Sequence, residues 1–242
     1  MTQEISPAGL WFGDVAYGAR TFVPMAISVG AYGLVWGVLA RGAGMSVWEV
    51  MLTSGLVFAG SAQFVALDLW TSDAASLPVG AIVLAALIIN LRYVLMTATM
   101  TPVFAGMHPA RAGLLSFLVT DEAWAMTMGQ VAKGRATPGF LLGAGGLAWI
   151  SWLATTTAGR LLGNAIDDPA RYGLDFAFVA AFLALLIGMW RGRSDLLPWL
   201  VAAAAALATS AMVPGKWYIL VGGLAGSLVG AVIETRKARH VA

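Results

Sequence analysis

Three charged residues stand inside long apolar stretches of this sequence: Arg92, Asp121 and Glu122. Each lies about nine residues or more from the nearest end of its stretch, which is roughly 14 Å along a helix. A charge at that depth in a membrane costs a few kcal/mol without a partner, and short acidic side chains cannot extend to water. A guanidinium can bind a carboxylate, and a buried carboxyl can hold an ammonium group or exchange a proton. The three residues therefore indicate a binding site for a charged solute within an apolar environment.

The depths of these charges match between neighbouring stretches. Arg92 lies about eleven residues before the end of its stretch, and Asp121 about nine residues after the start of the next. If the two stretches are antiparallel helices, Arg92 faces Asp121 or Glu122. A permanent ion pair is the structural interpretation, although such pairs stabilise weakly once desolvation is counted. In the functional interpretation, Arg92 or a carboxyl releases its partner to hold a ligand. Asn90, on a different helix face, is a further candidate for the same cavity.

A third group of polar residues lies in the segment 57–64, VFAGSAQF. Gly60 and Ser61 are small residues that permit an unwound turn, and free backbone groups of such a turn can bind the charged end of a substrate. Close helix packing through small residues is the equally weighted alternative. The amide of Gln63 needs a partner in an apolar environment, which favours a binding site. We therefore expect Gly60, Ser61 and Gln63 to contribute to substrate binding.

The composition identifies the environment in which these residues work. Of the 242 residues, 60% are hydrophobic and 11% charged, with a mean hydropathy of +0.82. A soluble domain typically has about 25% charged residues, so the composition excludes a cytosolic enzyme, a nucleic-acid binder and a disordered protein. A helix of about 20 residues crosses the ~30 Å hydrocarbon core. We predict an all-α integral membrane protein with a bundle of about eight transmembrane helices, or seven, some of them discontinuous. The eight segments are Thr21–Ala40, Val47–Trp70, Pro78–Val103, Ala112–Val131, Gly139–Gly163, Leu174–Trp190, Leu196–Val213 and Lys216–Ile233.

The chain is expected to form a single transporter domain over residues 1–242, with a segment 1–20 before the first span and a tail 234–242 after the last. The excess of Lys and Arg on the cytoplasmic side predicts the orientation. With eight spans, both termini are expected to be cytoplasmic, and Lys133 lies on their side, opposite Arg111. The cytoplasmic set is Arg20, Lys133, Arg135, Arg191, Arg193, Arg236, Lys237 and Arg239, and the opposite set is Arg41, Arg111, Arg160, Arg171 and Lys216.

Several reaction classes lack the residues they need. The sequence has no cysteine, and His108 and His240 are its two histidines, so no metal site and no cofactor are expected. No phosphate-binding loop motif is present, so that energy for transport must come from an ion gradient or a partner. No serine in an apolar stretch has a histidine to activate it, and we do not expect an enzyme.

Glycines and tryptophans add expectations about packing. Glycine recurs at every fourth residue in two places, at Gly33 and Gly37 and again at Gly222, Gly226 and Gly230. Such spacing allows another helix to approach closely. Packing within this chain is the favoured interpretation, and a docking face for a partner subunit is the alternative. Trp149 and Trp152 are expected to face the core or lipid.

Several stretches together resemble the AzlC family, the large subunits of bacterial branched-chain amino acid exporters. In order and spacing they cover nearly the whole chain. Two departures concern Tyr93, where members often have histidine, and Val179 or Ala180, where a proline is common. The matching stretches are 58–64 (FAGSAQF), 90–95 (NLRYVL), 118–125 (LVTDEAWA), 149–152 (WISW) and 174–177 (LDFA).

The resemblance implies a multi-pass permease of the bacterial cytoplasmic (inner) membrane that works with a small hydrophobic AzlD-like subunit. It implies export of valine, leucine, isoleucine and similar hydrophobic amino acids, driven by the proton gradient. The family's polar motifs fall on Gln63, Arg92, Asp121 and Glu122. A histidine proton relay is not expected, because Tyr93 occupies that position.

The first hypothesis is thus a proton-coupled exporter of hydrophobic amino acids. In it, Arg92 receives the substrate carboxylate, helped by backbone near Gly60 and Ser61 and oriented by Gln63. Asp121 or Glu122 holds the ammonium group and exchanges the proton. A passive channel for a small solute or ion is the second hypothesis, but a channel would carry polar residues along several spans rather than in one cluster. The third is a membrane scaffold subunit that transports nothing, in which the central charges would have no role.

Overall fold

The computed structural model describes most of the chain. The described residues are 12–163, 192–214 and 217–241, with Arg171, Gly173, Phe176, Leu183, Leu186, Ile187 and Trp190 in addition. Within these residues all regular secondary structure is helical, as the sequence predicts. Four helical segments are long and apolar enough to cross a membrane: 12–42, 79–99, 138–162 and 193–212. The predicted span Leu174–Trp190 lies almost entirely outside the described residues, as do residues 179 and 180.

The chain divides into two compact units, and the polar candidates all belong to the first. Unit 1 comprises residues 1–77 and 90–177, and unit 2 comprises residues 78–89 and 178–242. Helix α4 (Val79–Thr99) contributes to both, and its part from Asn90 onward belongs to unit 1.

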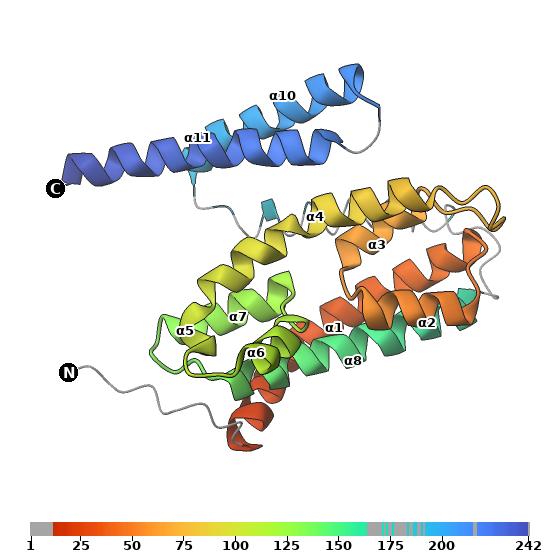
Figure 1. The fold of residues 1–242 in the computed structure, drawn as a ribbon, viewed down its shortest axis with the longest axis horizontal. Helices are drawn as coiled ribbons and strands as arrows, with labels where there is room; N and C mark the ends of the chain where they lie inside the picture. The colour runs from red at the N-terminus through yellow and green to blue at the C-terminus, as the bar shows by residue number, and fades with distance from the viewer. Residues whose placement is uncertain are drawn as a thin grey trace. The chain divides into compact units, whose positions relative to one another are not determined.

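Unit 1 is built on two long helices that pack side by side, α1 (Phe12–Gly42) and α8 (Pro138–Leu162) (Figure 1). They run parallel, because Gly18 of α1 lies against the backbone of Phe140 and Gly37 lies against that of Gly159. A Cβ atom added to Gly37 would overlap the carbonyl oxygen of Thr156. The glycines therefore let the two backbones touch, and the packing predicted within the chain for Gly33 and Gly37 is confirmed.

Two short helices, α2 (Val47–Leu56) and α3 (Gly60–Leu67), replace the predicted span Val47–Trp70, with the break at the turn that the segment 57–64 was expected to permit. They fold back on each other. The side chains of Ser54 and Gln63 hydrogen-bond across the pair, and Ser72 beyond α3 lies next to Gly44 before α2. Both outer ends of this hairpin therefore lie where α1 finishes, which we call the Gly42 end of unit 1 (Figure 1).

A second hairpin enters from the opposite end, where α1 begins, which we call the Phe12 end. Its helices are α6 (Pro109–Ser116) and α7 (Asp121–Val131), and they replace the predicted span Ala112–Val131. They follow α4 and the single turn α5 (Thr101–Phe104). The indole of Trp124 on α7 donates to the Thr99 hydroxyl at the end of α4 (2.9 Å), so α7 returns to the level at which α4 ends (Figure 1).

The fold-back corrects two predictions, although the expectation of discontinuous helices holds. Each hairpin helix has 8 to 11 residues, and at ~1.5 Å per residue it reaches about half of a ~30 Å hydrocarbon core. The two apolar stretches are each long enough for one span, but hydropathy does not show whether the chain crosses the membrane or turns back. Because the second stretch turns back, Arg111, in the first turn of α6, and Lys133, just after α7, lie at the outer ends of one hairpin rather than at opposite ends of one span.

The C-terminal part of unit 2 is a helical hairpin of α10 (Leu196–Met212) and α11 (Trp217–Val241) that begins after the single turn η4 (Arg193–Asp195). The glycine series of α11 faces α10. A Cβ on Gly222 would lie 2.9 Å from that of Ala206, and one on Gly226 would lie 2.8 Å from that of Ala202. This series too therefore packs within the chain. Helix α11 continues through the tail expected at 234–242, just as α1 begins before the predicted Thr21.

Candidate functional site

The candidate site lies where the tips of the two hairpins meet, about halfway along α8. The tip of the first hairpin contacts the tip of the second through the rings of Phe58 and Phe117, whose centroids are 5.9 Å apart. Phe58 has a φ of 44°, an uncommon conformation for a bulky residue that costs about 1–3 kcal/mol. Such strain persists where the surroundings enforce it, and here it turns the chain sharply between α2 and α3.

Helix α3 begins at this tip with open backbone donors. The first amides of a helix have no partner within it, and Ala59, which precedes Gly60, provides no side-chain cap. Gly60 itself is closely surrounded, since a Cβ there would lie 3.2 Å from the Trp152 ring. The glycine predicted to permit an unwound turn therefore stands at the first residue after the break.

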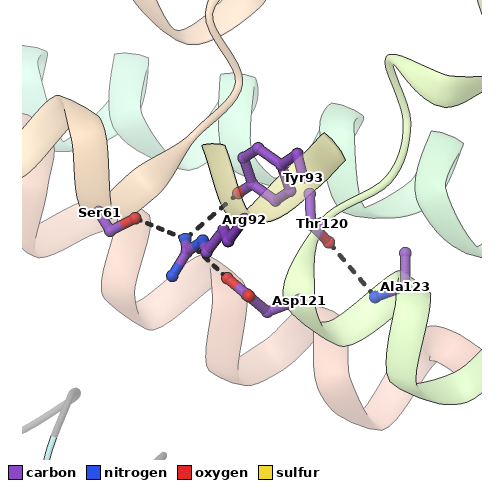
Figure 2. A network of polar contacts seen from close by, with 6 residues as sticks. All are labelled: Ser61, Arg92, Tyr93, Thr120, Asp121 and Ala123. Atoms are coloured by element: carbon purple, nitrogen blue, oxygen red, sulfur yellow. Dashed lines mark hydrogen bonds and ion pairs between the residues drawn. The ribbon is translucent and has the colours of Figure 1, made fainter. Parts of the chain in front are cut away.

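Helix α7 begins at the other tip with its carboxyls in the first turn. The hydroxyl of Thr120 caps the helix by accepting from the amide of Ala123 at 3.3 Å (Figure 2). Asp121 and Glu122 are the first two residues of the helix. Negative charge is favoured at a helix N-terminus, by about 0.3–1 kcal/mol at exposed sites. This offsets only part of the cost of placing two carboxyls in an apolar region.

Arg92 joins the two tips. Its Nη2 donates to the hydroxyl of Ser61 at 2.6 Å and lies 2.8 Å from a carboxylate oxygen of Asp121 (Figure 2). The same nitrogen makes a longer contact of 3.4 Å with the Tyr93 hydroxyl. The expected pairing of Arg92 with one of the two carboxyls is thus present, and Asp121 is the partner. Because Arg92 is 33% exposed and Asp121 36% exposed, the pair is accessible rather than sealed.

Glu122 is the second carboxyl of this cluster. It follows Asp121 directly in the first turn of α7. Among the described residues, however, no cation forms an ion pair with it. The Nε of Arg92 likewise has no hydrogen-bond partner there. The cluster therefore contains one paired carboxyl, one carboxyl without a cation and one guanidinium with a donor to spare.

Gln63 is held on both sides of its amide. Its Nε2 donates to Ser54 on α2 at 3.1 Å, and its Oε1 accepts from the indole of Trp152 on α8 at 2.8 Å. Trp149, one turn earlier on α8, donates to the carbonyl of Gly55 at 3.0 Å. The predicted need of Gln63 for a partner is met by protein groups, and direct contact with a substrate stays a prediction.

Asn90 lies close to Arg92 in sequence but has no described bond to the cluster. Its Oδ1 is buried and has no partner among the residues that the structure describes. The structure thus brings together Gly60, Ser61, Arg92, Asp121 and Glu122 at the meeting tips. A role of Asn90 in the same cavity remains an expectation.

Sequence reasoning missed the residues that surround the cluster. Trp152 of α8 is buried in the core, as expected, but the sequence did not indicate that Trp149 and Trp152 brace the broken helix with their indole N–H groups. Their spacing of three residues, on one helix face, was the available signal. Tyr32 of α1, whose ring stacks on Phe64 at 4.6 Å, was not singled out. A tyrosine inside an apolar stretch carries a polar end that needs a partner, which could have identified it.

Comparison with known proteins gives a consistent set of similarities. The model of the AzlC protein family matches residues 24–166 of this chain, which include every residue of the cluster. An uncharacterized membrane protein of Archaeoglobus fulgidus is 30% identical over 160 residues, covering 65% of this chain and 68% of its own length. No solved structure matches the chain significantly.

Two further relatives carry more informative names. The inner membrane protein YgaZ of Escherichia coli is 24% identical over 185 residues, covering 74% of each chain. The branched-chain amino acid transport protein AzlC of Bacillus subtilis is 24% identical over 206 residues, covering 85% of this chain and 78% of its own.

Proposed function

Because the chain belongs to the AzlC family, we propose that it is a secondary transporter that exports branched-chain or similar hydrophobic amino acids. The family is associated with membrane transport, and one relative is named for branched-chain amino acid transport. The observation that carries the proposal is the position of Arg92. It links the start of α3 to the start of α7 at the meeting tips of the two hairpins.

Arg92 binds the carboxylate of the amino acid. Its Nε has no hydrogen-bond partner among the described residues, and its Nη2 is bonded to Ser61, next to the open amides at Gly60. A carboxylate at this point would accept charge-assisted hydrogen bonds and face the positive end of a helix dipole. Aliphatic side chains of the surrounding helices take the hydrophobic side chain of the substrate.

The two carboxyls have different tasks in this proposal. Asp121 holds Arg92 while the site is empty and releases it when the substrate carboxylate takes its place. Glu122 forms no ion pair with a cation in the described part of the chain, so it either accepts the substrate ammonium group or carries a proton. Because one carboxyl cannot do both at once, loading of the proton and of the substrate exclude each other. This exclusion is what a proton-coupled antiporter requires.

Transport in vesicles tests the proposal. Vesicles that contain the protein are loaded with labelled leucine or valine, and a pH gradient is imposed. We expect saturable efflux that the gradient accelerates and that external unlabelled substrate stimulates. We expect Glu122→Gln to abolish the response to pH, and Asp121→Asn to weaken substrate discrimination while efflux persists. Flux without saturation or counterflow would indicate a channel instead, and unimpaired efflux in the double variant would remove the carboxyls from the mechanism.

We further propose that the chain is the large subunit of a two-component permease in the bacterial inner membrane, with a small hydrophobic AzlD-like partner. The supporting observation is that two relatives are named as inner membrane and transport proteins. Efflux should then rise when the partner is present in the same vesicles. Equal efflux with and without it would assign transport to this chain alone.

A further inference from the structure

The hydroxyl of Tyr32 is a buried polar group near the cluster to which the proposed function assigns no role. Its oxygen is buried and has no hydrogen-bond partner among the residues that the structure describes. An unsatisfied buried hydroxyl lowers stability, so its presence calls for an explanation outside the protein's own bonds. Resting on the proposed function, we infer that Tyr32 is a substrate-binding residue whose hydroxyl donates a hydrogen bond to the carboxylate of the bound amino acid.

The ring of Tyr32 is fixed in place by its neighbours. It stacks on Phe64 of α3, with centroids 4.6 Å apart and an angle of 20° between the planes. On its other side it packs against Trp152 of α8 at 5.8 Å, with the rings tilted by 52°. A ring held by a first-hairpin residue and by α8 cannot turn its hydroxyl toward another part of the protein. The donor is therefore oriented before any ligand arrives.

The Tyr32 ring lies beside the start of α3, where the other proposed carboxylate-binding groups are. A Cβ on Gly60 would lie 3.6 Å from Cε1 of Tyr32, and the hydroxyl oxygen is two bonds from that carbon. Gly60 is the residue at which the open amides of α3 begin. Ser61, the residue after Gly60, is bonded to Arg92, so the guanidinium belongs to the same end of α3. Tyr32 thus adds a third kind of donor beside the guanidinium and the helix N-terminus.

The Tyr32→Phe variant separates a binding role from a structural one, because it should weaken leucine binding without lowering the melting temperature. It removes a hydroxyl with no protein partner and keeps the stacked ring, so we expect the melting temperature in detergent to stay the same or rise. Binding of labelled leucine, by contrast, should weaken about tenfold or more, as for the loss of one hydrogen bond to a charged group. Tyr17→Phe is the matched control: its ring packs on Phe140 of α8, away from the cluster, and leucine binding should not change.

Each result decides between the claims. Unchanged leucine binding in Tyr32→Phe would overturn the inference and leave the proposed function standing, since the wild type still binds leucine. A lower melting temperature would show that the hydroxyl has a protein partner, and would overturn it too. If the wild type binds neither leucine nor valine, the proposed function falls and the inference with it. Leucinamide has no carboxylate, so an equal loss of affinity for leucine and leucinamide would overturn the assignment to the carboxylate.

Discussion

At the scale of single residues, one nitrogen of Arg92 connects the two hairpins, because it contacts both Ser61 of α3 and Asp121 of α7. Depth along the sequence placed Arg92 opposite Asp121 or Glu122, and the ion pair forms with Asp121. The second bond, to Ser61, comes from a break in the helix that sequence could only suggest. No sequence pattern distinguishes the paired carboxyl from the free one, because adjacent residues at a helix start differ only in the direction of their side chains.

The shape of the guanidinium, and not its charge alone, should matter at Arg92. Lysine would keep the charge but lacks the planar group that lies between Ser61 and Asp121. We therefore expect Arg92→Lys to lower the rate of leucine efflux by at least about tenfold, as for a loss of one charge-assisted bond of roughly 1.5–3 kcal/mol. Arg111→Lys, on α6 at the Phe12 end, is the control that should transport normally. Wild-type efflux in Arg92→Lys would reduce the site to a simple positive charge.

At the scale of elements, one of the two breaks carries a sequence signal that was recognised. Glycine and small polar residues around Gly60 indicated an unwound turn, and α2 ends just before it. The second break, at residues 117–120, has no glycine or proline. Its signal is a cap: Thr120 followed by two acidic residues is typical of a helix start. Within a long apolar stretch, the two acidic residues indicate a binding site, and the helix start that they also mark is not evident.

The parallel contact between α1 and α8 should depend on single glycines. A Cβ at Gly37 would overlap the Thr156 carbonyl oxygen, and one at Gly159 would overlap the Leu34 carbonyl oxygen. Because backbone atoms cannot move aside as a side chain can, we expect Gly37→Ala or Gly159→Ala to cost about 3 kcal/mol, the upper end of the usual range for overpacking.

Thermal unfolding in detergent measures this difference. Gly146→Ala, on the same helix α8, is the matched control, since nothing lies within 4 Å of the added carbon. Alanine is the better helix former by up to about 1 kcal/mol, so this variant should unfold at the same temperature or a higher one. Equal melting temperatures in all three variants would show that the backbones of α1 and α8 can separate without loss.

At the scale of the whole molecule, hydropathy predicted a helical membrane protein but not the path of the chain. An apolar stretch of about 20 residues has the same hydropathy whether it crosses the bilayer once or enters and returns. The fold-back is fixed by tertiary contacts, such as that of Ser54 with Gln63 and that of Gly44 with Ser72. These contacts join residues on the two sides of the turn, and no helical or strand periodicity in the sequence predicts them. Eight spans are therefore not confirmed: among the described residues, four helical segments are long and apolar enough to cross a membrane.

The topology can be tested by labelling, because the chain has no cysteine and single cysteines can be introduced without background. We expect Gly42→Cys and Ser76→Cys to react with a membrane-impermeant maleimide from the same side of the membrane, since nothing lies within 4 Å of a carbon added at Gly42. Gly134→Cys should react from the other side, which we predict to be cytoplasmic because Arg20, Arg111, Lys133 and Arg135 belong to the Phe12 end. Labelling of Gly42→Cys and Ser76→Cys from opposite sides would mean that α2 and α3 cross the membrane together.

The meeting of two half-length hairpins also has an electrical consequence. Their tips lie about halfway along α8, so in the proposed mechanism a proton that reaches Glu122 from either face of the membrane would cross about half of the transmembrane voltage. One elementary charge moved through 100 mV corresponds to about 2.3 kcal/mol, and half of that path to about 1.2 kcal/mol. Proton loading at Glu122 would then respond to voltage as well as to the difference in pH, and about equally from the two sides.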